Sequence, residues 1–258
     1  MLAYNTIFKR YILVVLTIGL LFSCASKEDV VYFQDSLEYE TIVSENTSSY
    51  KFKVDDVVSI HVSTLDPEAS MPFNLFKGAE EGGIRPEQVD YIIDKQGNID
   101  FPVLGSVKID GLSPEEVKTL LKERLIDYLK NPIINIRLKN FTVTILGEVN
   151  RPGTYPVNGE QITIFEALGL AGDLTIKGIR KNIKVIRDFN GTKVYNTIDL
   201  TSKDALESPV YYLTQNDVVY VEPNKSAITS SSLDNRATIT VSIISVLITS
   251  AAIFLTRN

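Results

Sequence analysis

Two pairs of neighbouring carboxylates are the residues of this chain that could do acid–base chemistry. Asp94 with Asp100, or Glu80 with Glu81, could in principle cleave a glycosidic bond, because that reaction needs one carboxyl group as acid and a second as nucleophile or base. Neither pair is accompanied by the nucleophile, base or metal motif that an active site shows in sequence. His61 is the only histidine and lies on the polar side of a strand pattern. We therefore predict no catalytic residue, no metal site and no cofactor.

A different chemistry is indicated at Cys24, the only cysteine of the chain. Residues 1–23 have the pattern of a secretory signal, with a positive start at Lys9 and Arg10 followed by an apolar stretch. The signal ends in "LFSC", which resembles the lipobox of bacterial lipoproteins, where the cysteine is acylated and becomes the new N-terminus. We predict that Cys24 carries lipid and opens a lipidated tether at 24–49. The alternative is an ordinary cleaved signal or a short uncleaved anchor.

The C-terminal end carries a second membrane signal, an uncharged run of 18 residues from Thr238 to Leu255. A helix of that length covers ~27 Å, close to the ~30 Å apolar thickness of a bilayer. We therefore predict a linker at 225–237 and a transmembrane helix at 238–256, in either the outer or the inner membrane. Small or hydroxylated residues recur on one side of this helix about every 3.5 positions. They are Thr238, Ser242, Ser245, Thr249 and Thr256.

This stripe has three possible roles. Small side chains let helices pack closely in lipid, so the stripe could be a helix contact. Its hydroxyls could also line a water-filled pore. The third alternative is a monomeric tail anchor whose hydroxyls bond their own backbone.

The charge balance excludes one class of partner. Without the signal the chain keeps 24 basic and 32 acidic residues, a net charge of −8. A general nucleic-acid-binding surface needs clustered lysine and arginine, so we predict no nucleic-acid partner. The stretch between Tyr50 and Lys225 is long enough for two small domains of roughly 90 residues each.

The first of these domains, residues 50–139, shows strand patterns, one helix and a returning strand. The segment "VVSIHVS" (57–63) alternates apolar and polar residues, as a half-buried strand does. A partly apolar loop at 64–89 is a candidate contact between copies of the chain. The helix is marked by Ser113 as N-cap and by Glu116, which completes a capping box.

The second domain, residues 140–224, repeats the order of strands, helix and strands. Thr163 and Glu166 form a second capping-box pattern. Asn190-Gly191 is a strong hairpin signal between two strand patterns. For both domains this order predicts a small mixed sheet with one helix on a face, which is an α+β arrangement.

Several segments of both domains resemble the polysaccharide biosynthesis/export family of outer-membrane lipoproteins. They are "YKFKVDDVVSIHV", "YIIDKQGNIDFPVLGSVKIDGLSPEEV", "NPIINIRL" and "FTVTILGEVNRPGTYPV…ITIFEALGLAGDLT". The resemblance covers roughly Tyr50 to Pro223, and its most specific part is "ILGEVNRPGTYPV" (145–157). It implies that residues 50–139 are the export domain and that 140–224 are an SLBB module, a ligand-binding β-grasp fold.

Two positions depart from the pattern of that family. The usual Gly-Asp of the opening motif is Asp55-Asp56 here, and the second glycine of a usual "AGG" is Asp173. Both departures concern turn geometry rather than a catalytic group.

The resemblance also implies a function. It indicates a lipid-anchored outer-membrane protein, mostly periplasmic, whose copies form an oligomeric channel that exports capsular or exopolysaccharide. The implied partners are the polysaccharide, membrane lipid, further copies of the chain in a ring, and an inner-membrane polysaccharide co-polymerase. The alternative is a monomeric or small-oligomer periplasmic ligand-binding lipoprotein that uses the β-grasp domain. The predicted fold class is α+β, with two small β-grasp-like mixed-sheet domains in tandem followed by the C-terminal transmembrane α-helix.

Overall fold

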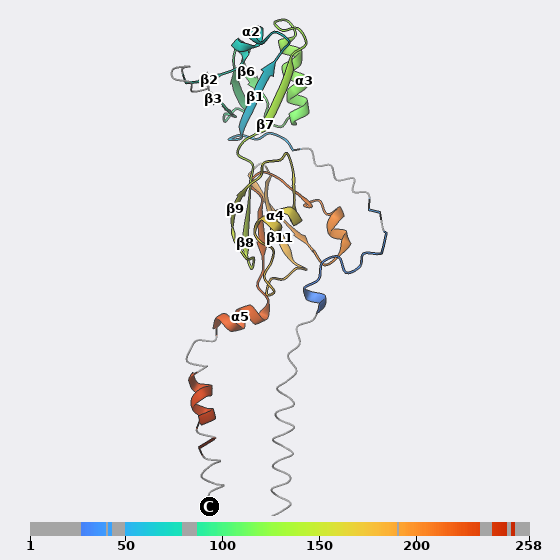
Figure 1. Ribbon diagram of the computed structural model, residues 1–258, viewed down its shortest axis with the longest axis vertical. Coiled ribbons are helices and arrows are strands. Elements are labelled where there is room, and N and C mark those ends of the chain that lie inside the picture. Colours follow the sequence, from blue (N-terminus) through green and yellow to red (C-terminus); the bar gives the residue numbers. More distant parts are fainter. Residues whose placement is uncertain are drawn as a thin grey trace, which may run out of the picture.

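The computed structural model describes residues 27–39, 41–42, 50–78, 87–189, 191–232, 239–246 and 249–250. Figure 1 shows two bodies of strands and helices joined end to end, with the described N-terminal segment running beside the second body.

The first domain is built on a three-stranded sheet in which β1 lies between β4 and β7. Both neighbours are antiparallel to β1. Its elements are β1 (Val57–Ser63), α2 (Pro67–Ser70), η2 (Met71–Phe73), β2 (Phe76–Lys77), β3 (Glu87–Gln88), β4 (Tyr91–Ile92), β5 (Asn98–Phe101), β6 (Gly105–Lys108), α3 (Pro114–Leu125) and β7 (Ile133–Leu138). Because every pair in this sheet is antiparallel, the mixed sheet predicted for this domain is wrong.

Helix α3 begins where its sequence predicts. The Glu116 carboxylate accepts a hydrogen bond from the Ser113 amide at 2.7 Å, and the Ser113 hydroxyl accepts one from the Glu116 amide at 3.3 Å. These two bonds satisfy amide groups that the first helical turn leaves unpaired. The helix buries Val117, Leu121 and Leu125 in the core of the first domain.

The second domain contains a five-stranded sheet of order β12-β11-β14-β8-β9. Strands β14 and β8 are parallel and the other pairs are antiparallel, so this sheet is mixed as predicted. Its elements are β8 (Thr142–Gly147), β9 (Gly153–Pro156), β10 (Ile162–Thr163), α4 (Ile164–Leu170), β11 (Ile183–Phe189), β12 (Thr192–Ile198), η3 (Lys203–Glu207), β13 (Tyr212–Leu213) and β14 (Val218–Val221).

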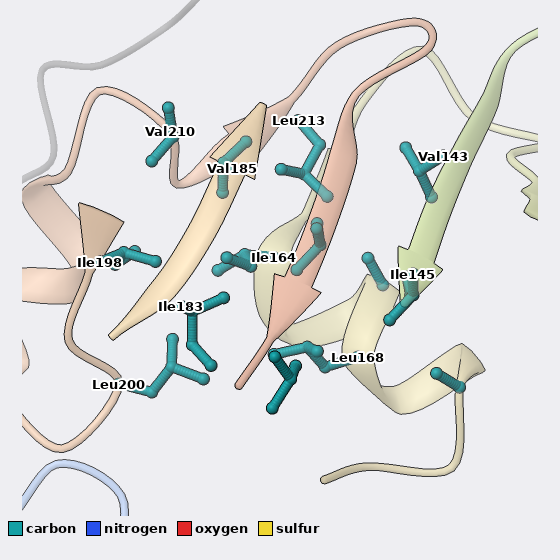
Figure 2. Close-up of a cluster of buried hydrophobic side chains, with 14 of the residues drawn as sticks. Val143, Ile145, Ile164, Leu168, Ile183, Val185, Ile198, Leu200, Val210 and Leu213 are labelled. Atoms are coloured by element: carbon teal, nitrogen blue, oxygen red, sulfur yellow. The ribbon is translucent and has the colours of Figure 1, made fainter. Parts of the chain in front are cut away.

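One face of this sheet forms the core of the second domain with α4. Figure 2 shows Ile164 and Leu168 of the helix among side chains of the sheet, and these residues belong to one buried cluster. The predicted capping box is present at the start of α4, where Thr163 and Glu166 bond reciprocally. Burial of this apolar face is the main force that holds the helix on the sheet.

The predicted transmembrane helix at 238–256 is wrong. Within the described ranges, which include 239–246 and 249–250 of that segment, no helix is both long and apolar enough to cross a membrane. The fold is therefore two α+β domains, followed in the described part of the chain by α5 (Lys225–Ser232) and by helical residues at 239–246 and 249–250.

Candidate functional site

The described residues closest in sequence to Cys24 form a strap across the second domain. We define the strap as residues 28–36, which begin within the short helix η1 (Lys27–Asp29). Cys24 itself lies outside the described residues. The polar composition of 24–49 predicts a simple tether, and the docking of the strap is a feature that the sequence did not indicate.

An aromatic cluster seats the strap on helix α4. The ring of Phe33 lies 4.8 Å from that of Phe165, and the ring of Tyr32 meets Phe165 edge-on at 6.1 Å. Tyr32 packs on the buried core of the second domain and is itself half-buried. Edge-to-face and tilted ring pairs at these distances are favourable beyond the area that they bury.

Polar contacts fix the position of the strap. The Tyr32 hydroxyl donates a hydrogen bond to Asp173 at 2.5 Å. Three residues later, the Asp35 carboxylate accepts bonds from the Ser202 hydroxyl at 2.7 Å and from the Lys203 amide at 2.6 Å. These two donors hold the pKa of Asp35 below its usual range. The middle of the strap and the part near its C-terminal end are therefore both held by hydrogen bonds to the second domain.

A buried arginine lies beneath the strap. Arg180 is 4% exposed, and its guanidinium carbon lies 5.6 Å from the centre of the Tyr32 ring. Its Nη1 donates to the carbonyls of Thr175 and Gly178 at 3.3 and 2.9 Å. Burial, reinforced by the bond to Asp173, raises the pKa of the Tyr32 hydroxyl, which therefore stays protonated as a donor.

The two departures from the family pattern both adopt the left-handed backbone conformation. Asp55 and Asp173 each have a φ of 69°. That conformation is natural for glycine, and aspartate tolerates it better than most residues do. At position 173 the aspartate supplies the carboxylate that accepts the hydrogen bond from the Tyr32 hydroxyl. At Asp55 the backbone carbonyl accepts a bond from the side chain of Asn140 at 3.1 Å.

Two amide side chains join the domains. The carbonyl of the Asn140 side chain accepts a hydrogen bond from the Val57 amide at 2.9 Å, where β1 begins. Gln215 donates to the Asn140 backbone carbonyl at 2.6 Å and accepts from the Thr142 amide at 2.8 Å, where β8 begins. The residues that connect the two domains are therefore hydrogen-bonded to both of them.

An aromatic contact reinforces this junction. The rings of Tyr50 and Phe141 are stacked, with centroids 6.4 Å apart. The Tyr50 hydroxyl donates to the buried Asp56 carboxylate, which also accepts from the Lys53 amide at 2.8 Å. Burial raises the pKa of Asp56. Lys53 reaches the second domain through the carbonyl of Asp188 at 3.4 Å.

The strap and α5 lie at the same end of the second domain. Lys177 donates to Ser230 of α5 at 3.3 Å, and Lys181, four residues later, pairs with Asp29 of the strap at 3.2 Å. In Figure 1, η1 and α5 both lie at the end of the second domain away from the first domain. The strap and α5 are therefore both bonded to the stretch 177–181 of the second domain.

The predicted C-terminal stripe is described at three of its five residues. Ser242, Ser245 and Thr249 are exposed, whereas Thr238 and Thr256 lie outside the described residues. The Ser245 hydroxyl donates to the Ser242 carbonyl at 2.9 Å, and the Thr249 hydroxyl donates to the Ser245 carbonyl at 2.7 Å. The role of the stripe as a pore lining or helix contact stays a prediction.

The candidate acid–base pairs do not form a site among the described residues. Asp94 accepts bonds from the amides of Gln96 and Asn98 at 2.9 and 2.8 Å, so its carboxylate shapes a turn. Asp100 is exposed on β5, and Glu80 with Glu81 lies outside the described residues. The described ranges also contain no group of three or more metal-ligating side chains.

Comparison with known proteins divides the chain at the same junction as the structure. Residues 44–139 match the model of a family described as polysaccharide biosynthesis/export protein. Residues 142–196 match the model of the SLBB domain. The boundary between the two matches falls at Asn140 and Phe141, where the inter-domain contacts gather.

Two curated relatives are named EPS I polysaccharide export outer membrane protein EpsA. The one from Ralstonia solanacearum is 23% identical over 203 residues, covering 75% of this chain and 53% of the relative. The one from Ralstonia nicotianae is 23% identical over 186 residues, covering 69% and 48%. This chain therefore spans about half the length of the curated relatives that it matches.

Proposed function

Because this chain belongs to the polysaccharide biosynthesis/export family, we propose that it acts in the export of a polysaccharide at the bacterial outer membrane. The observation that carries this proposal is the pair of consecutive family matches, one of which falls on each of the two structural domains. The names of the two relatives support the location and the class of cargo. The chain is not an enzyme, since the family is one of transport proteins.

The proposed protein is lipid-anchored through Cys24 and lies mostly in the periplasm. The strap begins at residue 28, four residues after Cys24, so its start lies within about 14 Å of the lipidated residue. The strap and α5 share one end of the second domain. This shared position supports an orientation in which the second domain lies next to the membrane and the first domain extends into the periplasm.

The proposed assembly is a homo-oligomeric ring around the path of the polymer. The side of residues 239–246 that carries Ser242 and Ser245 supports a contact between copies, because it is exposed in the single chain. We assign Ser242, Ser245 and Thr249, with Thr238 and Thr256, to this contact or to the wall of the polymer path. The first domain then faces an inner-membrane polysaccharide co-polymerase.

Deletion of the gene in its host tests export. The expected result is loss of the polymer from the cell surface with polymer retained inside the cell, and recovery when the wild-type gene is restored. A gene carrying Cys24→Ala should not restore surface polymer, because its product lacks the acyl chains. An undiminished amount of surface polymer in the deletion strain contradicts the proposed function.

Native mass measurement of the detergent-solubilised protein tests assembly separately. A ring predicts one large homo-oligomer, whereas the alternative ligand-binding lipoprotein predicts a monomer or small oligomer. A monomer in every detergent tested would refute the ring and leave the export role to the deletion experiment.

A further inference from the structure

We propose that the face of the second domain formed by Phe165, Asp173, Arg180 and the turn 200–203 is a peptide-binding site whose ligand is the strap of the same chain. The ligand class is a short peptide with a tyrosine, a second aromatic residue and, two residues later, an aspartate. The inference rests on the proposed function only where it assigns the site a role in membrane anchoring.

The first argument is that the site binds two side chains of the strap that are three residues apart. Tyr32 reaches Asp173, and Asp35 reaches Ser202 and the Lys203 amide. A shift of the strap by one residue would separate both pairs at once. The carboxylates are charged acceptors, and bonds to charged groups are the stronger class of hydrogen bond.

The second argument is that backbone bonds lie between these two side-chain contacts. The amides of Phe33 and Gln34 donate to the carbonyls of Leu200 and Thr201, at 3.4 and 2.7 Å. Main-chain bonds flanked by side-chain pockets are the usual way in which a domain binds an extended peptide. The contact therefore has the components of recognition rather than of incidental packing.

The third argument is that the strap holds its own bound shape. The Gln34 side chain donates to the carbonyls of Glu28 and Val31, at 2.8 and 2.7 Å. Ser36 donates to the carbonyl of Phe33 at 2.8 Å. A peptide folded on itself in this way loses less conformational entropy on binding.

The fourth argument concerns Asp173. The resembled motif has glycine at this position, and the left-handed backbone persists here with φ of 69°. The aspartate is therefore not required by the turn. Its carboxylate accepts from the Tyr32 hydroxyl and from the Leu174 amide at 2.6 Å. The residue that departs from the pattern is the one that the strap uses.

The site would give the lipidated end of the chain a bound position independent of the covalent connection between residues 36 and 50. The second domain would then be held next to the lipid by its contacts with the strap as well as by the covalent chain. This role distinguishes the strap from a passive tether.

The test separates the strap from the body of the protein by a cut. The protein carries Cys24→Ala behind an ordinary secretory leader, so that no acyl chain holds the pieces together. A protease recognition sequence replaces residues 44–49, which lie outside the described ranges. After cleavage of the purified protein, we expect the N-terminal fragment to stay with the body in gel filtration.

Synthetic peptides then measure recognition. A peptide of residues 27–39 should displace the fragment, and the same peptide with Tyr32→Phe should compete about tenfold more weakly, as loss of one charge-assisted bond predicts. Tyr39→Phe is the matched control, because Tyr39 is 100% exposed. In a body carrying Asp173→Gly, which suits the backbone, the wild-type and Tyr32→Phe peptides should compete equally.

Two results would overturn the proposal: release of the fragment from the wild-type body on cleavage, or equal weakening by Tyr32→Phe and Tyr39→Phe. Neither result bears on export, since the assay contains no lipid and no polymer. Conversely, an unmodified Cys24 in the native protein would refute lipid anchoring and leave the binding result unchanged.

Discussion

The guanidinium of Arg187 pairs with the fully buried carboxylate of Asp217 through two nitrogens. Nη2 lies 2.7 Å from one carboxylate oxygen, and Nε lies 3.0 and 3.1 Å from the two oxygens. The same carboxylate accepts from the amide and the hydroxyl of Thr214. This pair ties β11 to the turn before β14, at the centre of the second domain's sheet.

Removal of the arginine should destabilise the protein strongly. Arg187→Ala leaves a buried charge without its partner, which costs about 3–5 kcal/mol. Lys193→Ala is the control, because Lys193 and Asp188 form an exposed pair whose loss should hardly change the stability. Urea unfolding at neutral pH measures both. Similar losses for the two variants would contradict the structural role of the buried pair.

The domain junction should weaken when Gln215 is shortened. Gln215→Ala leaves the Asn140 carbonyl and the Thr142 amide without their partner, at about 1–3 kcal/mol for each group that stays dry. Gln96→Ala is the control, since the side chain of Gln96 is exposed. Small-angle scattering should show a wider range of domain orientations for Gln215→Ala only. Identical scattering of both variants would mean that the junction does not depend on this side chain.

Docking of the strap should weaken in acid. The Ser202 hydroxyl and the Lys203 amide lower the pKa of Asp35, so the folded state favours the charged carboxylate. A lowered pKa gives a stabilising contribution that is present above the ordinary value near 4 and is lost as the pH falls through the lowered value. Hydrogen exchange of the Gln34 amide, which donates to Thr201, should therefore show less protection below about pH 4. With Asp35→Asn this pH dependence should be absent; its persistence would assign the effect to another group.

The C-terminal stripe should mark contacts between copies. In protein that keeps Cys24, a single Ser245→Cys should form disulfide-linked dimers in the membrane under mild oxidation. Ile244→Cys, on the neighbouring side of the same turns, should not, because adjacent helical residues point about 100° apart. Crosslinking of both positions to the same extent, or of neither, would remove the stripe from the proposed interface.

Local signals in the sequence predicted the elements that need only local chemistry. The capping boxes at Ser113 and Thr163 are present because each depends on residues three positions apart. The hairpin of β11 and β12 forms around Gly191, whose φ of +82° is the conformation that a tight turn requires. Such signals act within one turn of chain and do not depend on the rest of the fold.

The strap could not be predicted because its partners are distant in sequence. Tyr32 bonds a residue 141 positions later, and Asp35 bonds one 167 positions later. The segment is too short and too polar for a periodic pattern. The only available signal was the unusual aspartate at 173, which became interpretable once its hydrogen-bond partner was known.

The transmembrane prediction failed for a related reason. Absence of charge over 18 residues is a necessary condition for a spanning helix and does not by itself establish one. Hydroxyls dilute the apolar character of the segment, and Ser245 and Thr249 bond back to the helix carbonyls, a pattern that slightly destabilises helices.

The order in which the chain visits its domains sets how the molecule would carry tension. The strap precedes the first domain in sequence but is bound to the second domain, and α5 leaves that same domain. A pull between the two ends of the chain would therefore pass through the strap bonds and the second domain's sheet. The first domain lies outside this load-bearing path. It could tilt while the load between the strap and α5 bypasses its sheet.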